Sequence, residues 1–203
     1  ITVSHRKNSH EYERLLELIR PLMGEPKRIM PQIFPLQCHI DKAHKILELS
    51  GWNGENIVVL APAAAWRTKR YPYFQKIAEM LINNGVFVIS IGAKDDMEIC
   101  HNIIPSHAHN NSAIVVDEKL LIVAALLKIS NAVVANDSGI GHLASAVKTP
   151  VVSIFGPTIP QQGFAPLGEY NKIIQIDIEC RPCSAHGGYK CPLGNHKCMI
   201  EIK

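Results

Sequence analysis

The chain of 203 residues is 47% hydrophobic and 19% charged, which is the composition of a folded globular protein and not of a disordered one. Its formal net charge of +3 is too small to indicate nucleic-acid binding, although it would not repel a phosphate-bearing ligand or an anionic membrane surface. No apolar run approaches the roughly 20 residues of a membrane-spanning helix and no signal peptide opens the chain, so we expect a soluble, cytosolic protein.

The first 50 residues predict two helices joined by a strap. Leucines and an isoleucine at helical spacing indicate a helix over residues 9–22, and three prolines interrupt regular structure over residues 23–36. A second helix is expected at about residues 41–50, opened by Asp41. Because the chain starts at Ile1 and not at Met, we expect it to be part of a longer gene product or the result of processing.

From about residue 52 onward, short apolar strands alternate with helices, which indicates a parallel sheet covered on both faces. Right-handed crossovers then make an α/β domain of the doubly wound type. Ligands of such sheets lie at the carboxyl ends of the strands, so the loops there are the candidate site. The expected strands are 56–61, 86–91, 113–116, 132–135, 151–155 and 172–176, with helices at 72–84, 95–103, 118–128 and 138–147.

The loop after the strand at 132–135 has the residues of an anion site. Asp137 or Ser138 can cap the next helix, and Gly139 allows a ligand to approach the backbone closely. The free N–H groups and the positive dipole end of that helix attract an anion. His142 follows one turn later, and helical side chains lean back toward the helix start. A capped helix with a solvated histidine is the alternative interpretation.

Three cations, Arg67, Lys69 and Arg70, follow the first expected strand and precede a helix. Small residues upstream let the backbone come near a ligand, and one of these cations could reach a phosphate in a charge-assisted contact. A solvated basic loop is the alternative, but the glycine-containing helix start at the same sheet edge favours a shared site. Asp95 and Asp96 belong to that edge too, where a carboxylate could bind ribose hydroxyls; a helix cap is the preferred interpretation.

Four cysteines crowd into the tail, with the spacing Cys180-x2-Cys183-x7-Cys191-x6-Cys198. Four thiolates could hold a structural zinc, but the second pair lacks the C-x-x-C spacing of common zinc ribbons. Buried or loosely paired thiols are therefore preferred over zinc, and zinc over disulfides, because no secretory signal is present. None of these states implies catalysis.

Together these motifs resemble glycosyltransferase family 9, the ADP-heptose:lipopolysaccharide heptosyltransferases. Their order and spacing agree with the family over about residues 40–203. The segments that carry the resemblance are Asn136-Asp137-Ser138-Gly139-x-x-His142-Leu143-Ala144, Phe155-Gly156-Pro157-Thr158, Lys69-Arg70-Tyr71-Pro72, Cys180-x-Pro182-Cys183 and Cys191-Pro192-Leu193-Gly194.

The resemblance implies a Rossmann-like doubly wound sheet that forms the C-terminal domain of a two-domain GT-B glycosyltransferase. Residues 1–39 would be the helix and strap left from the N-terminal acceptor domain, and residues 40–203 the nucleotide-sugar-binding domain with its cysteine-rich tail. The complete enzyme would move heptose from ADP-heptose to the lipopolysaccharide inner core, with inversion and without a metal or other cofactor. It would work in the cytoplasm, with peripheral contact to the inner membrane, and without nucleic acid.

The resemblance also assigns roles to single residues. Lys69 would contact the pyrophosphate or the transferred sugar and stabilise the departing ADP, and Asp137 would bind heptose hydroxyls. The catalytic base would be an aspartate of the N-terminal domain, so this chain alone would be inactive. The other expected donor-binding residues are Ala64, Ala65, Asp95, Ser138, Gly139 and His142. The alternatives are a relative that uses another sugar nucleotide, or a non-catalytic interaction module with a zinc-bound tail.

Overall fold

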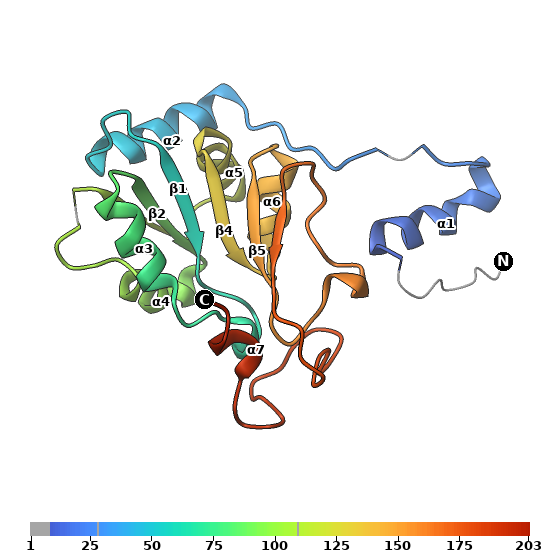
Figure 1. The fold of residues 1–203 in the computed structure, drawn as a ribbon. Coiled ribbons are helices and arrows are strands. Elements are labelled where there is room, and N and C mark those ends of the chain that lie inside the picture. Colours follow the sequence, from blue (N-terminus) through green and yellow to red (C-terminus); the bar gives the residue numbers. More distant parts are fainter. Residues whose placement is uncertain (1–8, 28, 109) are drawn as a thin grey trace.

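The computed structural model describes residues 9–27, 29–108 and 110–203. Within them, six parallel strands form one sheet in the order β3-β2-β1-β4-β5-β6 (Figure 1). The chain runs outward from β1 to β3, then returns to the other side of β1 and runs outward again. This confirms the doubly wound α/β fold. The strands are β1 (Ile57–Ala61), β2 (Phe87–Gly92), β3 (Ser112–Val116), β4 (Ala132–Asn136), β5 (Val151–Ile154) and β6 (Lys172–Ile174).

Helices cover both faces of the sheet, as expected for strands that are apolar along their whole length. On one face lie α2 (Gln37–Leu49), α5 (Leu120–Ile129) and α6 (Gly139–Ala146), and on the other α3 (Phe74–Asn83) and α4 (Met97–Asn102). Helix α5 is apolar around its circumference, and six of its ten residues are buried between the sheet and α2. A helix of that composition is stable only when it is enclosed.

The second helix starts earlier than expected. Helix α2 begins at Gln37 and not at about residue 41, and Asp41 is not its cap. The ring Nδ1 of His39 instead accepts a hydrogen bond of 3.0 Å from the backbone N–H of Leu36, which satisfies a donor at the helix start from inside the helix. Ala43 and Leu47 are fully buried, so α2 belongs to the core of the domain.

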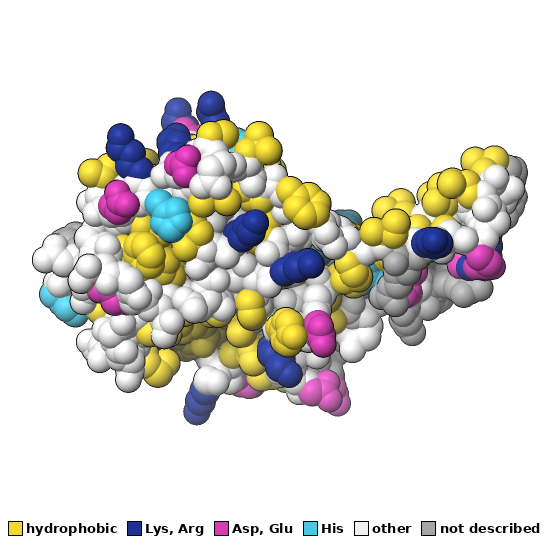
Figure 2. Space-filling model, turned by 90° about the horizontal axis from the view of Figure 1, so that it is seen from above, with side chains coloured by type: hydrophobic (Ala, Val, Ile, Leu, Met, Phe, Trp, Pro, Cys, Tyr) yellow, Lys and Arg dark blue, Asp and Glu magenta, His cyan; other side chains and the backbone are white. Residues whose placement is uncertain are grey.

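The N-terminal arm consists of α1 (Glu11–Met23) and the strap that follows it, and it projects away from the sheet (Figure 1). None of the residues of α1 is buried, and its Leu15, Leu18 and Leu22 are 55%, 56% and 76% exposed. Figure 2 shows hydrophobic side chains along this arm. None of the described helices has the length and apolar character required to cross a membrane.

The tail ends in a short helix that the sequence pattern did not predict, α7 (Lys197–Ile200). Its Met199 is fully buried in the core cluster that includes Phe74 and Ile154. A Cβ atom at Gly156 would lie 2.7 Å from the Met199 side chain, so the absence of a side chain there makes room for the tail. The cysteine-rich segment is therefore fixed to the domain at its far end.

Candidate functional site

A cavity of about 870 Å³ lies at the carboxyl ends of β1, β2 and β4. This is where the strand order reverses, the usual ligand position in a doubly wound sheet. Much of its wall is apolar, and the strap contributes Ile33, whose N–H donates to the carbonyl of Ala146 at 3.0 Å. Six of the expected donor-binding residues line the cavity: Ala64, Ala65, Asp95, Ser138, Gly139 and His142.

The other two expected residues, Lys69 and Asp137, meet beside this cavity. The Nζ of Lys69 lies 2.6 Å from Oδ2 of Asp137, and the two side chains are only 13% and 7% exposed. The same carboxylate oxygen accepts a hydrogen bond of 2.7 Å from the hydroxyl of Thr158. The structure thus brings the basic loop and the start of α6 together, as the shared sheet edge predicted. Because both charges are largely desolvated, each depends on its partner.

The start of α6 carries no side-chain cap. Ser138 occupies the N-cap position, but its side chain does not bond the helix backbone, and Asp137 is engaged with Lys69. The predicted cap is therefore wrong, because the ion pair outcompetes it. The Ser138 hydroxyl is inaccessible to solvent and has no hydrogen-bond partner among the described residues. A Cβ at Gly139 would meet nothing within 4 Å, so the space beside the first turn of α6 is open.

Asn136 shapes the loop that holds Lys69, a role that the sequence analysis missed. Its side chain is fully buried; Oδ1 accepts from the N–H of Tyr71 at 3.0 Å and Nδ2 donates to the carbonyl of Pro62 at 2.8 Å. The end of β4 thereby ties together both ends of the loop after β1. A buried side-chain amide needs hydrogen-bond partners, so an asparagine at the end of an apolar strand was the sequence signal for this role.

His142 lies one turn into α6 at the mouth of the cavity and is solvent-exposed. Partial desolvation by the surrounding protein lowers the pKa of its imidazole below the ordinary value, and the carboxylate of Asp137 opposes that effect. This shift favours the neutral form of the ring. A neutral imidazole can donate one hydrogen bond and accept another, which suits a sugar or phosphate oxygen.

The two acidic residues after β2 have separate roles. Asp96 Oδ2 accepts a hydrogen bond of 3.1 Å from the N–H of Ala93, which closes the 3-10 turn Lys94–Asp96, but its side chain makes no cap hydrogen bond to α4. Asp95 is exposed and lines the cavity. Arg70 also lines it, with its Nε donating to the carbonyl of Ala64 at 3.0 Å and one Nη 4.0 Å from Asp96.

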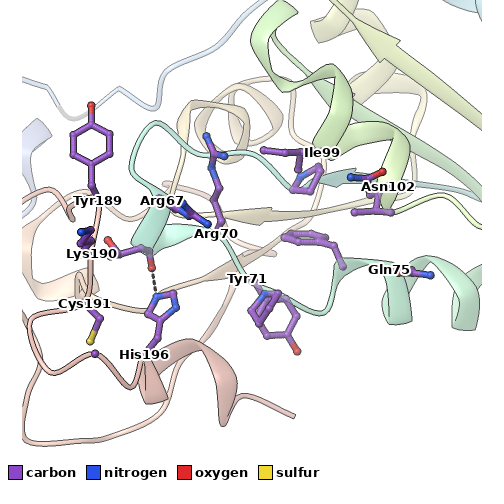
Figure 3. A pocket seen from close by; sticks show the side chains of 16 residues that line it. Arg67, Arg70, Tyr71, Gln75, Ile99, Asn102, Tyr189, Lys190, Cys191 and His196 are labelled. Carbon is purple, nitrogen blue, oxygen red and sulfur yellow. Dashed lines mark hydrogen bonds between the residues drawn. The ribbon is translucent and has the colours of Figure 1, made fainter.

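A second cavity of about 760 Å³ lies between the basic loop, α3, α4 and the tail (Figure 3). Arg67, Tyr189, Lys190 and His196 line it, and Arg70 borders both cavities. None of the eight expected donor-binding residues lines this second cavity. The expected donor-binding residues therefore gather at the first cavity and not at the second.

All six cysteines are free thiols, which contradicts the disulfide alternative. Cys198 is buried, and desolvation raises its pKa to about 11. Desolvation opposes ionisation of Cys191 too, but hydrogen bonds from four nearby backbone N–H groups lower its pKa. Among the described residues, no group of three or more His, Cys, Asp or Glu side chains is arranged to hold a metal ion.

Comparisons with known proteins agree with the motifs. Residues 2–193 match the family model of glycosyltransferase family 9 (heptosyltransferase). Over 157 residues the chain is 31% identical to lipooligosaccharide heptosyltransferase 2 of Campylobacter jejuni, a match that covers 74% of this chain and 48% of the relative. The chain spans about half the length of the curated relatives it matches.

Solved structures show the same fold. The ADP-heptose lipopolysaccharide heptosyltransferase II of E. coli superposes with a TM-score of 0.70 at 23% identity, over 88% of this chain and 51% of that one. The E. coli heptosyltransferase WaaC with ADP superposes with a TM-score of 0.60 at 22% identity, over 83% and 51%. The match to the family model covers most of the sequence. The chain belongs to glycosyltransferase family 9, the heptosyltransferase family.

Proposed function

We propose that this chain is the donor-binding half of an enzyme that moves heptose from ADP-heptose to the lipopolysaccharide inner core. The observation that carries the proposal is the pairing of Lys69 with Asp137 at 2.6 Å, next to the uncapped start of α6 and the 870 Å³ cavity. A cation, free backbone N–H groups and an apolar cavity are the parts that a nucleoside diphosphate requires.

The diphosphate would lie between Lys69 and the first turn of α6. The ammonium group supplies a charge-assisted bond, and the N–H groups at Gly139 supply donors aligned with the helix dipole. Both are in place before the donor arrives. As the bond between the anomeric carbon and the β-phosphate oxygen breaks, negative charge builds on ADP, and fixed donors stabilise that charge without further reorganisation.

Asp137 would change partners during binding. Without donor the carboxylate of Asp137 pairs with Lys69. With donor the ammonium group of Lys69 would also contact the diphosphate. The carboxylate is an acceptor only, so it can receive hydrogen bonds from sugar hydroxyls next to the diphosphate. Thr158 holds the carboxylate through the exchange, since its hydroxyl donates to the same oxygen. The adenosine would enter the apolar part of the cavity, with Asp95 at the ribose.

The rest of the reaction needs the half of the enzyme that lies outside this chain. By the family resemblance an aspartate there takes the proton of the acceptor hydroxyl, whose oxygen attacks the anomeric carbon from the face opposite to ADP. The exposed leucines of α1 would pack against that half. We infer that the isolated chain binds donor without transferring it. A lipid-linked acceptor would place the enzyme at the cytoplasmic surface of the inner membrane.

Ligand binding by this chain tests the proposal. ADP and ADP-heptose should bind in isothermal titration calorimetry and raise the melting temperature, because a ligand that binds only the native state stabilises it. UDP and GDP at the same concentration serve as controls for the base. A folded chain that shows neither heat nor a thermal shift with millimolar ADP would contradict the proposal. Preference for another sugar nucleotide would keep the fold and change the donor.

A further inference from the structure

The cysteine-rich tail folds back onto the residue that precedes Lys69. The N–H of Thr68 donates to the carbonyl of Gly188 at 3.0 Å, and the hydroxyl of Thr68 donates to the same carbonyl at 2.8 Å and accepts from the N–H of Gly188 at 2.9 Å. The ring Nε2 of His196 donates to the carbonyl of Thr68 at 2.7 Å, the bond drawn as a dashed line in Figure 3. Thr68 is 5% exposed. Every polar group of Thr68 is therefore bonded to the tail.

The tail also packs along the stem of Lys69. A Cβ atom at Gly187 would lie 3.1 Å from Trp66 Cβ and 3.2 Å from both Cγ and Cε of Lys69. Gly187 has a φ of +95°, a conformation that favours glycine, so a side chain there would be strained and would press against Lys69. Tyr189 meets Trp66 edge to face, with ring centroids 5.2 Å apart. These contacts restrict the aliphatic chain of Lys69 on the side of the tail.

The same tail supports the other member of the ion pair. The guanidinium group of Arg181 donates to the carbonyl of Thr158 at 2.7 Å, and the N–H of Cys183 donates to the carbonyl of Pro157 at 2.9 Å. The hydroxyl of Thr158 in turn holds Asp137. One segment thus fixes the backbone next to Lys69 and the residue that binds its carboxylate partner.

Lys69 needs such support because the loop that carries it restrains the side chain only weakly. The residues Arg67–Lys69 form a single 3-10 turn, and a long lysine side chain loses rotamer entropy when it is fixed. A cation that acts on a developing charge is effective only when it is held in place beforehand. We propose that residues 181–198 are a brace that positions Lys69, with Thr68, Gly188 and His196 as positioning residues that do not touch the donor. This inference rests on the proposed function.

A double-mutant cycle on ADP binding by this chain tests the brace. Thr68→Val removes the hydroxyl and keeps the shape of the side chain, whereas Thr68→Ser keeps the hydroxyl. We expect Thr68→Val to weaken ADP binding about tenfold and Thr68→Ser to stay within twofold of the parent. In a Lys69→Met background, Thr68→Val should have no further effect, because its influence passes through the lysine.

His196→Ala and His196→Gln form an independent pair, since glutamine retains a donor at a similar reach; the first should weaken binding and the second should restore it. Circular dichroism and melting curves confirm that each variant is folded. A loss that is equally large with Met at position 69, or unchanged affinity in folded Thr68→Val and His196→Ala, would overturn the brace while leaving the donor site intact. A parent chain that does not bind ADP would instead overturn the proposed function, and the brace with it.

Discussion

The ammonium group of Lys69, in the loop after β1, lies 2.6 Å from the carboxylate of Asp137, which follows β4. Strands β1 and β4 are parallel neighbours, paired from Val58 with Ala132 to Ala61 with Ala135. Their loops therefore leave the sheet at the same edge, at the point where the strand order reverses. An anion that enters there meets a cation from one loop and a helix start from the other.

Replacing Lys69 should weaken phosphate binding, and it should also lower the stability of the fold because the buried carboxylate of Asp137 loses its cation. Lys69→Met keeps most of the side-chain volume and removes the charge, and a hydrogen bond to a charged group is worth about 1.5–3 kcal/mol. We expect the Kd for ADP to rise by about 10- to 100-fold in calorimetry. Arg67→Ala is the matched control, because Arg67 is an exposed cation of the same turn that faces the second cavity. An ADP affinity for Lys69→Met within twofold of that of the parent would place the diphosphate elsewhere.

Asp137→Asn should raise the affinity for ADP more than the affinity for ADP-heptose. The amide removes a negative charge next to the proposed diphosphate position, so ADP should bind several-fold more tightly. The same change replaces an acceptor of sugar hydroxyls, so the preference for ADP-heptose over ADP should fall. The ratio of the two dissociation constants is the measurement. A ratio equal to that of the parent would exclude Asp137 from the sugar subsite.

Asn136 should matter for stability in the absence of any ligand. Asn136→Ala leaves the N–H of Tyr71 and the carbonyl of Pro62 without their partners inside the protein, and a buried unsatisfied group costs about 1–3 kcal/mol. Urea unfolding should show a fall of about 2–4 kcal/mol in the free energy of unfolding. Asn102→Ala, on the exposed surface of α4, should change it by less than about 0.5 kcal/mol. Equal losses of stability in Asn136→Ala and Asn102→Ala would mean that contacts other than those of Asn136 hold the loop after β1.

The thiols of the tail should differ in reactivity for electrostatic reasons. The thiolate is the nucleophile, so a lowered pKa speeds alkylation and a raised pKa slows it near neutral pH. Iodoacetamide at pH 7.5 should modify Cys191 before Cys183, although Cys183 is the more exposed, because desolvation raises the pKa of Cys183. Cys198, with its pKa of about 11, should react last. Peptide mass spectrometry over time gives the order, and faster modification of Cys183 than of Cys191 would contradict it.

The sheet edge and the pairing of loops could be predicted from the sequence for a definite reason. Apolar runs such as residues 86–91 locate the strands, and parallel strands all present their carboxyl ends to one edge. Once Lys69 and Asp137 were assigned to loops at that edge, their approach required only that β1 and β4 be neighbours. Helix caps were predicted less well, because Asp137 has a buried cation as a stronger partner, and α2 is capped from within by His39.

The contact between the tail and Thr68 could not be predicted from the sequence pattern. Residues 181–196 have neither helical nor strand periodicity, and their contacts with the basic loop use the backbone of Gly188 and the ring of His196. Helix α7 is only four residues long, so its burial in the core leaves no periodic signal. Tertiary contacts made by irregular backbone follow from the folded structure and not from residue spacing.

The docking of the N-terminal arm depends on Gly163. The N–H of Glu11 donates to the Gly163 carbonyl at 2.9 Å, the ring Nε2 of His10 donates to the carbonyl of Ala165 at 2.8 Å, and a Cβ at Gly163 would lie 2.7 Å from the carbonyl oxygen of Ser9. Gly163→Ala should therefore release the start of α1, and the amide of Glu11 should exchange with deuterium faster.

Gly54→Ala is a matched control for this release. Gly54 has a φ of +93°, against +95° at Gly163, but a Cβ there meets nothing within 4 Å. Both variants should lose about 1 kcal/mol of stability, because alanine disfavours positive φ. Only Gly163→Ala should also speed exchange over residues 11–14, since only there does the new methyl group clash with the arm. Equal exchange in the two variants would show that the arm is held by contacts other than those at Gly163.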